Sequence, residues 1–182
     1  MKNLAKVLFL AGLCVTARLA FGADPGPDSA TCVVNVTVTQ IIEWEGDAYA
    51  DIDLADITAQ DDPETGFSVY TLWINCNVSL TADNTIAAEL DNTGDVPPGT
   101  DTLVTEYYVD YDGDGASATG GTDTTYATYD NFISGGSAIT HVDNDGAVEI
   151  RLYARASNRA DEVADAGDYT CTQTLTATWA SD

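Results

Sequence analysis

The chain has 182 residues and a formal net charge of −24, with 30 acidic residues against six Lys and Arg. Such an acidic surface repels nucleic acid and anionic lipid, and we therefore exclude nucleic-acid binding. It attracts divalent cations or suits a salty exterior. A chain of this length supports one domain with a core of ordinary size, and no Pro/Ser-rich linker divides it.

Residues 1–22 have the order of a secretory signal peptide. Two lysines precede an apolar run over residues 7–15, and small residues follow, which predicts cleavage before Ala23. We expect an exported chain of about 160 residues, extracellular or on the cell surface, with no second apolar run long enough to span a membrane. Three arginines then remain against thirty acidic residues, a formal charge of −27 with no lysine.

Period-two alternation of apolar residues dominates the mature chain, and no amphipathic helix is indicated. The predicted strands cover residues 32–44, 52–57, 70–80, 86–90, 103–111, 138–142, 147–156 and 169–179. A hairpin through Asp143–Gly146 is expected to join residues 138–142 to 147–156. The pattern predicts an all-β fold, an immunoglobulin-like antiparallel sandwich of about seven or eight strands.

The last predicted strand is the most informative segment. Residues 165–171 read Asp-Ala-Gly-Asp-Tyr-Thr-Cys, a tyrosine-corner-like entry into a strand that ends near Trp179. Because an immunoglobulin sandwich covers this strand with one more, we expect its outer backbone edge to lie open beside an apolar groove. Such an edge favours the addition of a strand from another chain.

An acidic motif follows the strand over residues 103–111. Asp110-Tyr-Asp112-Gly-Asp114-Gly115 matches the first half of a calcium loop, in which alternate carboxylates converge on one ion. The twelfth position is Gly121 in place of the usual Glu. A Ca²⁺ site at Asp110, Asp112 and Asp114 and a plain solvated turn therefore both remain open.

The three mature cations, Arg151, Arg155 and Arg159, lie at intervals of four. On a strand, Arg151 and Arg155 point to the same side. They either pair with neighbouring carboxylates or form the only positive patch of a very acidic particle, and such a patch would dock an acidic face of the next subunit.

Enzymatic chemistry is poorly supported. His141 is the sole histidine, and no motif supplies a nucleophile and an orienting acid for it. Carboxylates are so abundant that no chosen pair is informative. We therefore expect no enzyme. Tyr126, Tyr129 and Phe132 are the nearest approach to an exposed aromatic cluster, and they equally fit a role in pinning a loop to the core.

Three blocks of sequence carry a family resemblance. They read Val34-Asn-Val36-Thr-Val38-Thr39, then Ile74-Asn75-Cys76, then Ala166-Gly167-Asp168-Tyr169 followed by Thr172-Gln-Thr174-Leu-Thr176-Ala-Thr178. This layout resembles the spore coat protein U and archaic chaperone-usher pilin group, and the last block is its most specific part. The resemblance implies a subunit that lacks its final strand and is completed by the N-terminal strand of a neighbour.

On that view residues 23–40 hold the donor strand, with Val34, Val36 and Val38 as its groove-filling side chains, and residues 41–182 form the sandwich. The implied partners are further copies of the chain and an assembly chaperone.

Two resemblances imply different disulfides. Cys76, at the end of a long strand, and Cys171, two residues after Tyr169, resemble the paired cysteines of immunoglobulin domains, which implies a Cys76–Cys171 bridge. The pilin group instead implies a Cys32–Cys76 bridge, although Cys32 precedes the valines here, whereas the first cysteine of that group follows its donor strand. One cysteine is left over in either case.

These observations predict a structural subunit of an extracellular filament, fimbria or sheath that donates its N-terminal strand to a neighbouring subunit. Its subunit interface is expected to include Val34, Val36, Val38, Arg151 and Arg155. The alternative is a secreted, calcium-dependent module that binds a surface or a carbohydrate, and a cluster of exposed aromatic side chains would favour it.

Overall fold

The computed structural model describes residues 30–46, 50–112, 119–120, 123–141 and 146–181. The chain divides into two compact units, residues 1–37 and residues 38–182, and every strand described belongs to the second unit. Among these residues no helix has the length and apolar character needed to cross a bilayer.

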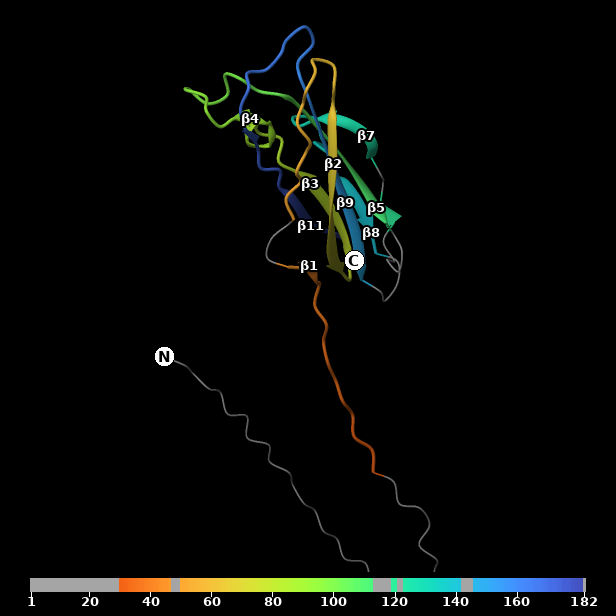
Figure 1. Cartoon of the computed structure of the whole chain (residues 1–182). Coiled ribbons are helices and arrows are strands. Elements are labelled where there is room, and N and C mark those ends of the chain that lie inside the picture. The colour runs from red at the N-terminus through yellow and green to blue at the C-terminus, as the bar shows by residue number, and fades with distance from the viewer. Residues whose placement is uncertain (1–29, 47–49, 113–118, 121–122, 142–145, 182) are drawn as a thin grey trace, which may run out of the picture. The chain divides into compact units, whose positions relative to one another are not determined.

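Two antiparallel sheets form the second unit (Figure 1). The larger sheet has the order β1-β2-β9-β5-β7, with bounds Ile42–Trp44, Glu64–Ile74, Ala147–Ser157, Val104–Asp112 and Asp123–Thr128. The smaller sheet has the order β11-β3-β8-β6, with bounds Leu175–Ser181, Asn77–Ala82, Ser137–Thr140 and Thr119–Gly120. A short ladder pairs β4 (Asp91–Asn92) with β10 (Tyr169–Thr170), and a 3₁₀ turn, η1, covers Ile86–Ala88.

The core forms because inward positions on the facing sheets are apolar at every second residue. In β9 the side chains of Val148, Ile150, Leu152 and Ala154 are buried and those between them are not, as the sequence predicts. From β3 and β5, Val78, Leu80 and Val109 are buried in the same cluster. Burial of such aliphatic side chains contributes roughly 1.5–3 kcal/mol each to folding.

The strand order is that of an immunoglobulin-like sandwich, which confirms the predicted fold class. β1, β2, β9 and β5 take the places of strands A, B, E and D, and β11 and β3 take those of F and C. The next strand of that plan, G, would pair with the edge of β11 that faces away from β3. In the part of the chain described here, β3 is the one strand paired with β11, so the place of G is unfilled there.

The prediction of a single strand over residues 70–80 is wrong, because the chain crosses between the sheets in the middle of the run. β2 ends at Ile74 in the larger sheet, and β3 begins at Asn77 in the smaller one. Cys76 is buried at the corner between them. Since the inner faces of both sheets face one core, the apolar alternation passes through the corner without a break.

The predicted hairpin over residues 138–156 is also wrong. β8 pairs with β3 and β6, whereas β9 pairs with β2 and β5, so the connection joins the two sheets instead of neighbouring strands.

Three shorter predictions are corrected as well. Residues 86–88 form η1, the segment 52–57 is extended without strand pairing, and only residues 42–44 of the first predicted strand pair in a ladder.

Two valines test which side chains of the larger sheet point toward the core. Val148 of β9 is fully buried, and Val69 of β2 points outward. We expect Val148→Ala to lower the free energy of unfolding by about 2–3 kcal/mol, because it removes two buried methyl groups and leaves a cavity. Val69→Ala is the matched control and should cost less than about 0.5 kcal/mol. Equal losses in denaturant titrations of the two variants would contradict the assigned phase.

Candidate functional site

A groove of about 1260 Å³ opens beside the N-terminal end of β11. Two stretches of chain line it, residues 50–60 and residues 163–173. Its floor is apolar and comes from the core of the sandwich, and includes Tyr70, Leu103, Tyr107, Leu152, Ala154 and Leu175. We refer to this hollow as the groove.

The first wall, residues 50–60, is extended but belongs to neither sheet. Its apolar side chains alternate toward the core: Ile52 and Leu54 are half-buried, whereas Asp51 and Asp53 are exposed. The side chains of Ile52 and Leu54 lie so close to Gly66 of β2 that a Cβ there would meet each at 2.9 Å. Glycine at this inward position of β2 therefore lets the wall pack closely against the sheet.

The second wall, residues 163–173, is held by a tyrosine corner. The Tyr169 hydroxyl lies 2.8 Å from the backbone oxygen of Asp165 and also contacts the carboxylate of Asp101, so these two acceptors share its one proton. The same carboxylate accepts from the Asn92 side chain and from the Asp165 backbone N–H, both at 3.1 Å. Burial, followed by the hydrogen bond to Asp101, raises the pKa of Tyr169 to about 12. The predicted tyrosine-corner-like entry is thus present, with Asp101 as an added acceptor.

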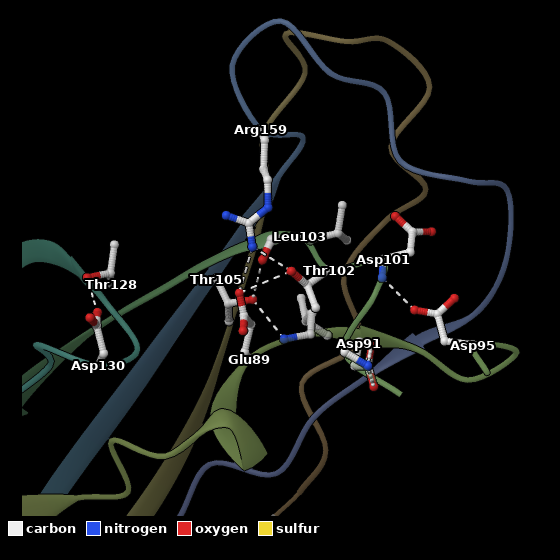
Figure 2. A network of polar contacts seen from close by, with 12 residues as sticks. Glu89, Asp91, Asp95, Asp101, Thr102, Leu103, Thr105, Thr128, Asp130 and Arg159 are labelled. Atoms are coloured by element: carbon white, nitrogen blue, oxygen red, sulfur yellow. Dashed lines mark hydrogen bonds and ion pairs between the residues drawn. The ribbon is translucent and has the colours of Figure 1, made fainter. Parts of the chain in front are cut away.

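The ion pair between Arg159 and Glu89, drawn in Figure 2, is next to the groove in sequence, because Glu89 precedes Leu90 and Arg159 follows Asn158, and both of these neighbours line the groove. The Arg159 guanidinium contacts the Glu89 carboxylate at 2.8 Å and the Thr102 hydroxyl at 2.5 Å. Nearby, the side-chain amide of Asn158 donates to the backbone oxygens of Ala59 and Gln60, at 3.2 and 3.4 Å. The side-chain oxygen of Asn158 also accepts from the Ala164 N–H at 3.0 Å, so Asn158 joins the two walls, while Arg159 contacts Glu89, the residue that follows η1.

A thiol and a phenol meet on the groove lining. Cys171 Sγ lies 3.2 Å from Tyr107 Oη, and the Tyr107 hydroxyl is 2.8 Å from the Ala88 carbonyl oxygen. Because a hydroxyl has one proton and Ala88 accepts it, the Cys171 thiol donates to Tyr107. Burial raises the pKa values of both groups.

Residues 50–58 of the first wall and the outer edge of β11 have no strand partner among the described residues. An apolar floor between two such edges can accept an extended segment, which hydrogen-bonds through its backbone and places alternate side chains on the floor.

The predicted donor side chains lie on an exposed extended segment, residues 33–39, which we call the valine segment. Val34 and Val36 are each 86% exposed, and residues 30–40 have no assigned strand pairing. Asn75 holds the chain at the end of the segment, since its side chain accepts from the Ile41 N–H at 2.7 Å and donates to the Thr39 oxygen at 3.0 Å.

No disulfide includes Cys32, Cys76 or Cys171 in the structure, so the expected Cys76–Cys171 bridge is not formed there. The register explains why. Asn77, next to Cys76, lies opposite Ser181 at the end of β11, whereas Cys171 precedes the first residue of that strand. The length of β11, about 20 Å at 3.3 Å per residue, separates the two cysteines, and a bridge needs Cα atoms within about 7 Å.

The arginines make local ion pairs, as one of the two open interpretations expected. Arg155 contacts Glu106 of the adjacent strand at 2.5 Å, and Arg151 contacts Glu149 of its own strand at 2.6 Å. Arg151 and Arg155 therefore have acidic partners within their own chain.

The calcium motif falls largely outside the described residues. Asp110 lies on β5 with Arg151 as its cross-strand neighbour, while Asp114 and the side chain of Asp112 are not described. In the ranges that are described, no group of three potential metal ligands occurs. The calcium site therefore stays a prediction.

The candidate aromatic cluster of Tyr126, Tyr129 and Phe132 is divided between the core and the surface. Phe132 is fully buried and Tyr129 packs against the core, so both pin the loop, whereas Tyr126 lies on the outer face of the larger sheet. His141 follows β8, where its backbone N–H donates to the Asn77 side chain at 2.9 Å.

Sequence reasoning missed a row of four rings on the outer face of the larger sheet. We call Phe67, Tyr153, Tyr108 and Tyr126 the aromatic row; successive ring centroids lie 5.3, 4.1 and 4.7 Å apart. Arg155 lies over the Tyr126 ring, 4.3 Å from its centroid. Tyr108 and Tyr153 occupy outward positions of predicted strands, whereas Phe67 and Tyr126 lie where no strand was predicted. The alignment of the four rings depends on the strand order, which no single strand reveals.

Comparison with known proteins finds no matching family model, curated protein or solved structure.

The tyrosine corner makes a prediction about acid stability. The hydrogen bond from Tyr169 is the largest cause that lowers the pKa of Asp101 below its ordinary 3.8. A lowered folded-state pKa stabilises the fold above the unfolded-state pKa, and this contribution is lost as pH falls through the folded-state value. We expect Tyr169→Phe to unfold at higher pH than the wild type in acid titrations followed by circular dichroism.

Tyr126→Phe removes a hydroxyl from the outer face and is the control. It should leave the acid transition in place. If the two variants shift the transition equally, Asp101 is not held by the tyrosine corner.

Proposed function

We propose that the protein is a structural subunit of an extracellular filament, fimbria or sheath, and that the valine segment of one copy fills the groove of the next. One observation carries the proposal: the groove lies between residues 50–60 and 163–173 and reaches the first residue of β11, Leu175, where strand G of the immunoglobulin plan would begin to cover the outer edge of that strand. The resemblance to the spore coat protein U and archaic pilin group points the same way. The proposal assigns no enzymatic activity to the chain.

The valine segment suits this groove in length and in phase. Its seven residues span about 20 Å when extended at 3.3 Å per residue, the same as the seven-residue β11, whose first residue lines the groove. Val34, Val36 and Val38 share one face, and the polar residues Asn35, Thr37 and Thr39 share the other. Three valines buried at roughly 1.5 kcal/mol each, together with backbone pairing, support a slowly dissociating contact.

The charge of the mature chain affects how such a polymer forms. Copies with a formal charge of −27 repel one another at long range, and this repulsion is screened within about 10 Å at 0.1 M salt. Strand insertion acts at short range and uses side chains without charge. We therefore expect assembly to be faster at high salt, which fits a salty exterior.

An open sheet edge beside apolar residues is an aggregation hazard. The groove would need a cover between synthesis and assembly, and this supports an assembly chaperone as a second partner. Export by way of the predicted signal peptide would place both proteins outside the cytoplasm.

Two adjacent valines test the proposal in the full mature chain. Val33 and Val34 are similarly exposed, so aspartate at either position leaves the folded subunit intact. Only Val34 shares the face of Val36 and Val38. We expect Val34→Asp to abolish filaments in negative-stain microscopy, because a carboxylate would have to enter an apolar groove, while Val33→Asp still forms them.

The melting temperature separates a failed assembly from a failed fold. The Val34→Asp subunit keeps its own groove, so a synthetic peptide of residues 32–39 should raise its melting temperature in a concentration-dependent way. Filaments from both variants, or from neither, would contradict the phase of the valine segment and with it the proposed assembly.

The aromatic row favours a second candidate function, a module that binds a neutral polysaccharide. Phe67 is 58% exposed, and the paired charges Arg155–Glu106 flank the row with hydrogen-bonding groups. A neutral sugar chain incurs no repulsion from a surface of charge −27, whereas an anionic one does. Stacked rings also stabilise a sheet by themselves, at about 0.5–1.5 kcal/mol per pair.

Polysaccharide pull-down distinguishes these roles. If the row binds sugars, Phe67→Ala should lower binding to insoluble cellulose or chitin at least several-fold while the melting temperature changes little. Trp179→Ala, an exposed aromatic on the other sheet, is the control and should bind as the wild type does. No binding by the wild-type protein would assign the row to sheet stability alone.

A further inference from the structure

The position of Cys171 on the groove lining has a consequence for assembly. Its thiol is held beside the Tyr107 hydroxyl at 3.2 Å, so the sulfur has a defined place where an inserted strand would run. The register keeps Cys76 about the length of β11 away, at the other end of that strand. A partner for Cys171 therefore has to come from somewhere other than Cys76.

The valine segment brings a third cysteine with it. Cys32 is exposed and lies two residues before Val34, in phase with Val34, Val36 and Val38. If these valines face the floor of the groove, the side chain of Cys32 faces it too.

A bridge between Cys32 and Cys171 would fix the direction in which the valine segment is inserted. From Cys32 to Val38 is six residues, and from Cys171 to Ala177 is also six. In a strand parallel to β11, Val36 and Val38 then lie level with the inward residues Leu175 and Ala177, and Cys32 lies level with Cys171. In the reverse direction Cys32 would lie at the opposite end of the groove.

We propose that a disulfide between Cys32 of one copy and Cys171 of the next locks the valine segment into the groove, parallel to β11. We call this disulfide the lock. It rests on the proposed strand addition, and it would turn a polymer held by reversible contacts into a covalent one.

The bond forms by two exchanges with an external disulfide, either of a small thiol such as glutathione or of an oxidoreductase. The Cys32 thiolate first attacks that disulfide, forms a mixed disulfide and releases one thiolate. After insertion, the Cys171 thiolate attacks the Cys32 sulfur and expels the second thiolate. The external disulfide takes up two electrons, and the two thiol protons leave with the released thiols or to solvent. Cys32 reacts first because it is exposed, while burial raises the pKa of Cys171.

Non-reducing gel electrophoresis of filaments assembled with oxidised glutathione tests the lock. Wild-type filaments should give a ladder of covalent oligomers in detergent that collapses to monomer with reductant. Cys32→Ser and Cys171→Ser should form filaments in the microscope but run as monomers, a complete loss of the ladder. Cys76→Ser is the matched control and should keep it. Peptide mapping without reduction should recover a fragment pair that joins Cys32 to Cys171.

The outcomes separate the lock from the assembly. Wild-type filaments that run as monomers after oxidation overturn the lock and leave strand addition intact. A ladder that survives in Cys171→Ser but disappears in Cys76→Ser also overturns it, because Cys32 would then reach the far end of β11. An absence of filaments from every variant and from the wild type would overturn the proposed function itself.

Discussion

The structure depends on how the backbone of β11 is satisfied. One edge of this strand pairs with β3, and its first residue, Leu175, is buried in the core, while the groove opens beside it. An open sheet edge exposes unpaired backbone donors and acceptors. Here these polar groups lie beside apolar core residues, so water that hydrates the backbone also contacts apolar side chains. The walls, the tyrosine corner and the Arg159 ion pair hold this opening in shape, so the groove is a built part of the fold.

Charge is arranged to leave the floor of this opening apolar, while the aspartates that line it lie on its walls. Arg151, Arg155 and Arg159 each have a carboxylate partner within 3 Å, and the many other acidic residues carry the net charge of the molecule. The groove floor, by contrast, consists of uncharged side chains such as Leu103, Leu152 and Leu175. Long-range repulsion and short-range apolar attraction therefore act on different parts of the surface, and salt alters the first more than the second.

Much of the fold could be predicted from the sequence, because inward positions alternate wherever a strand faces the core. The alternation failed at Cys76 and at the connection after β8 for one reason: period two shows which side chains point inward but not to which sheet a strand belongs. It also failed at residues 52–57, where the apolar side chains point inward but the backbone has no strand partner.

The candidate site was predicted in part. The tyrosine corner and the exposed edge follow from a local motif and a strand count, both visible in the sequence. The wall formed by residues 50–60 and the contact of Cys171 with Tyr107 depend on segments far apart in the chain, as does the aromatic row. Their arrangement follows from strand order and register, which local patterns do not encode.

The structure of the assembled filament, determined by electron cryomicroscopy, tests the central claim most directly. The account predicts continuous density for the valine segment of one subunit beside β11 of the next, with Val34, Val36 and Val38 facing Tyr107, Leu152 and Leu175. Subunits that meet through other surfaces, with the groove empty or filled by their own chain, would contradict it.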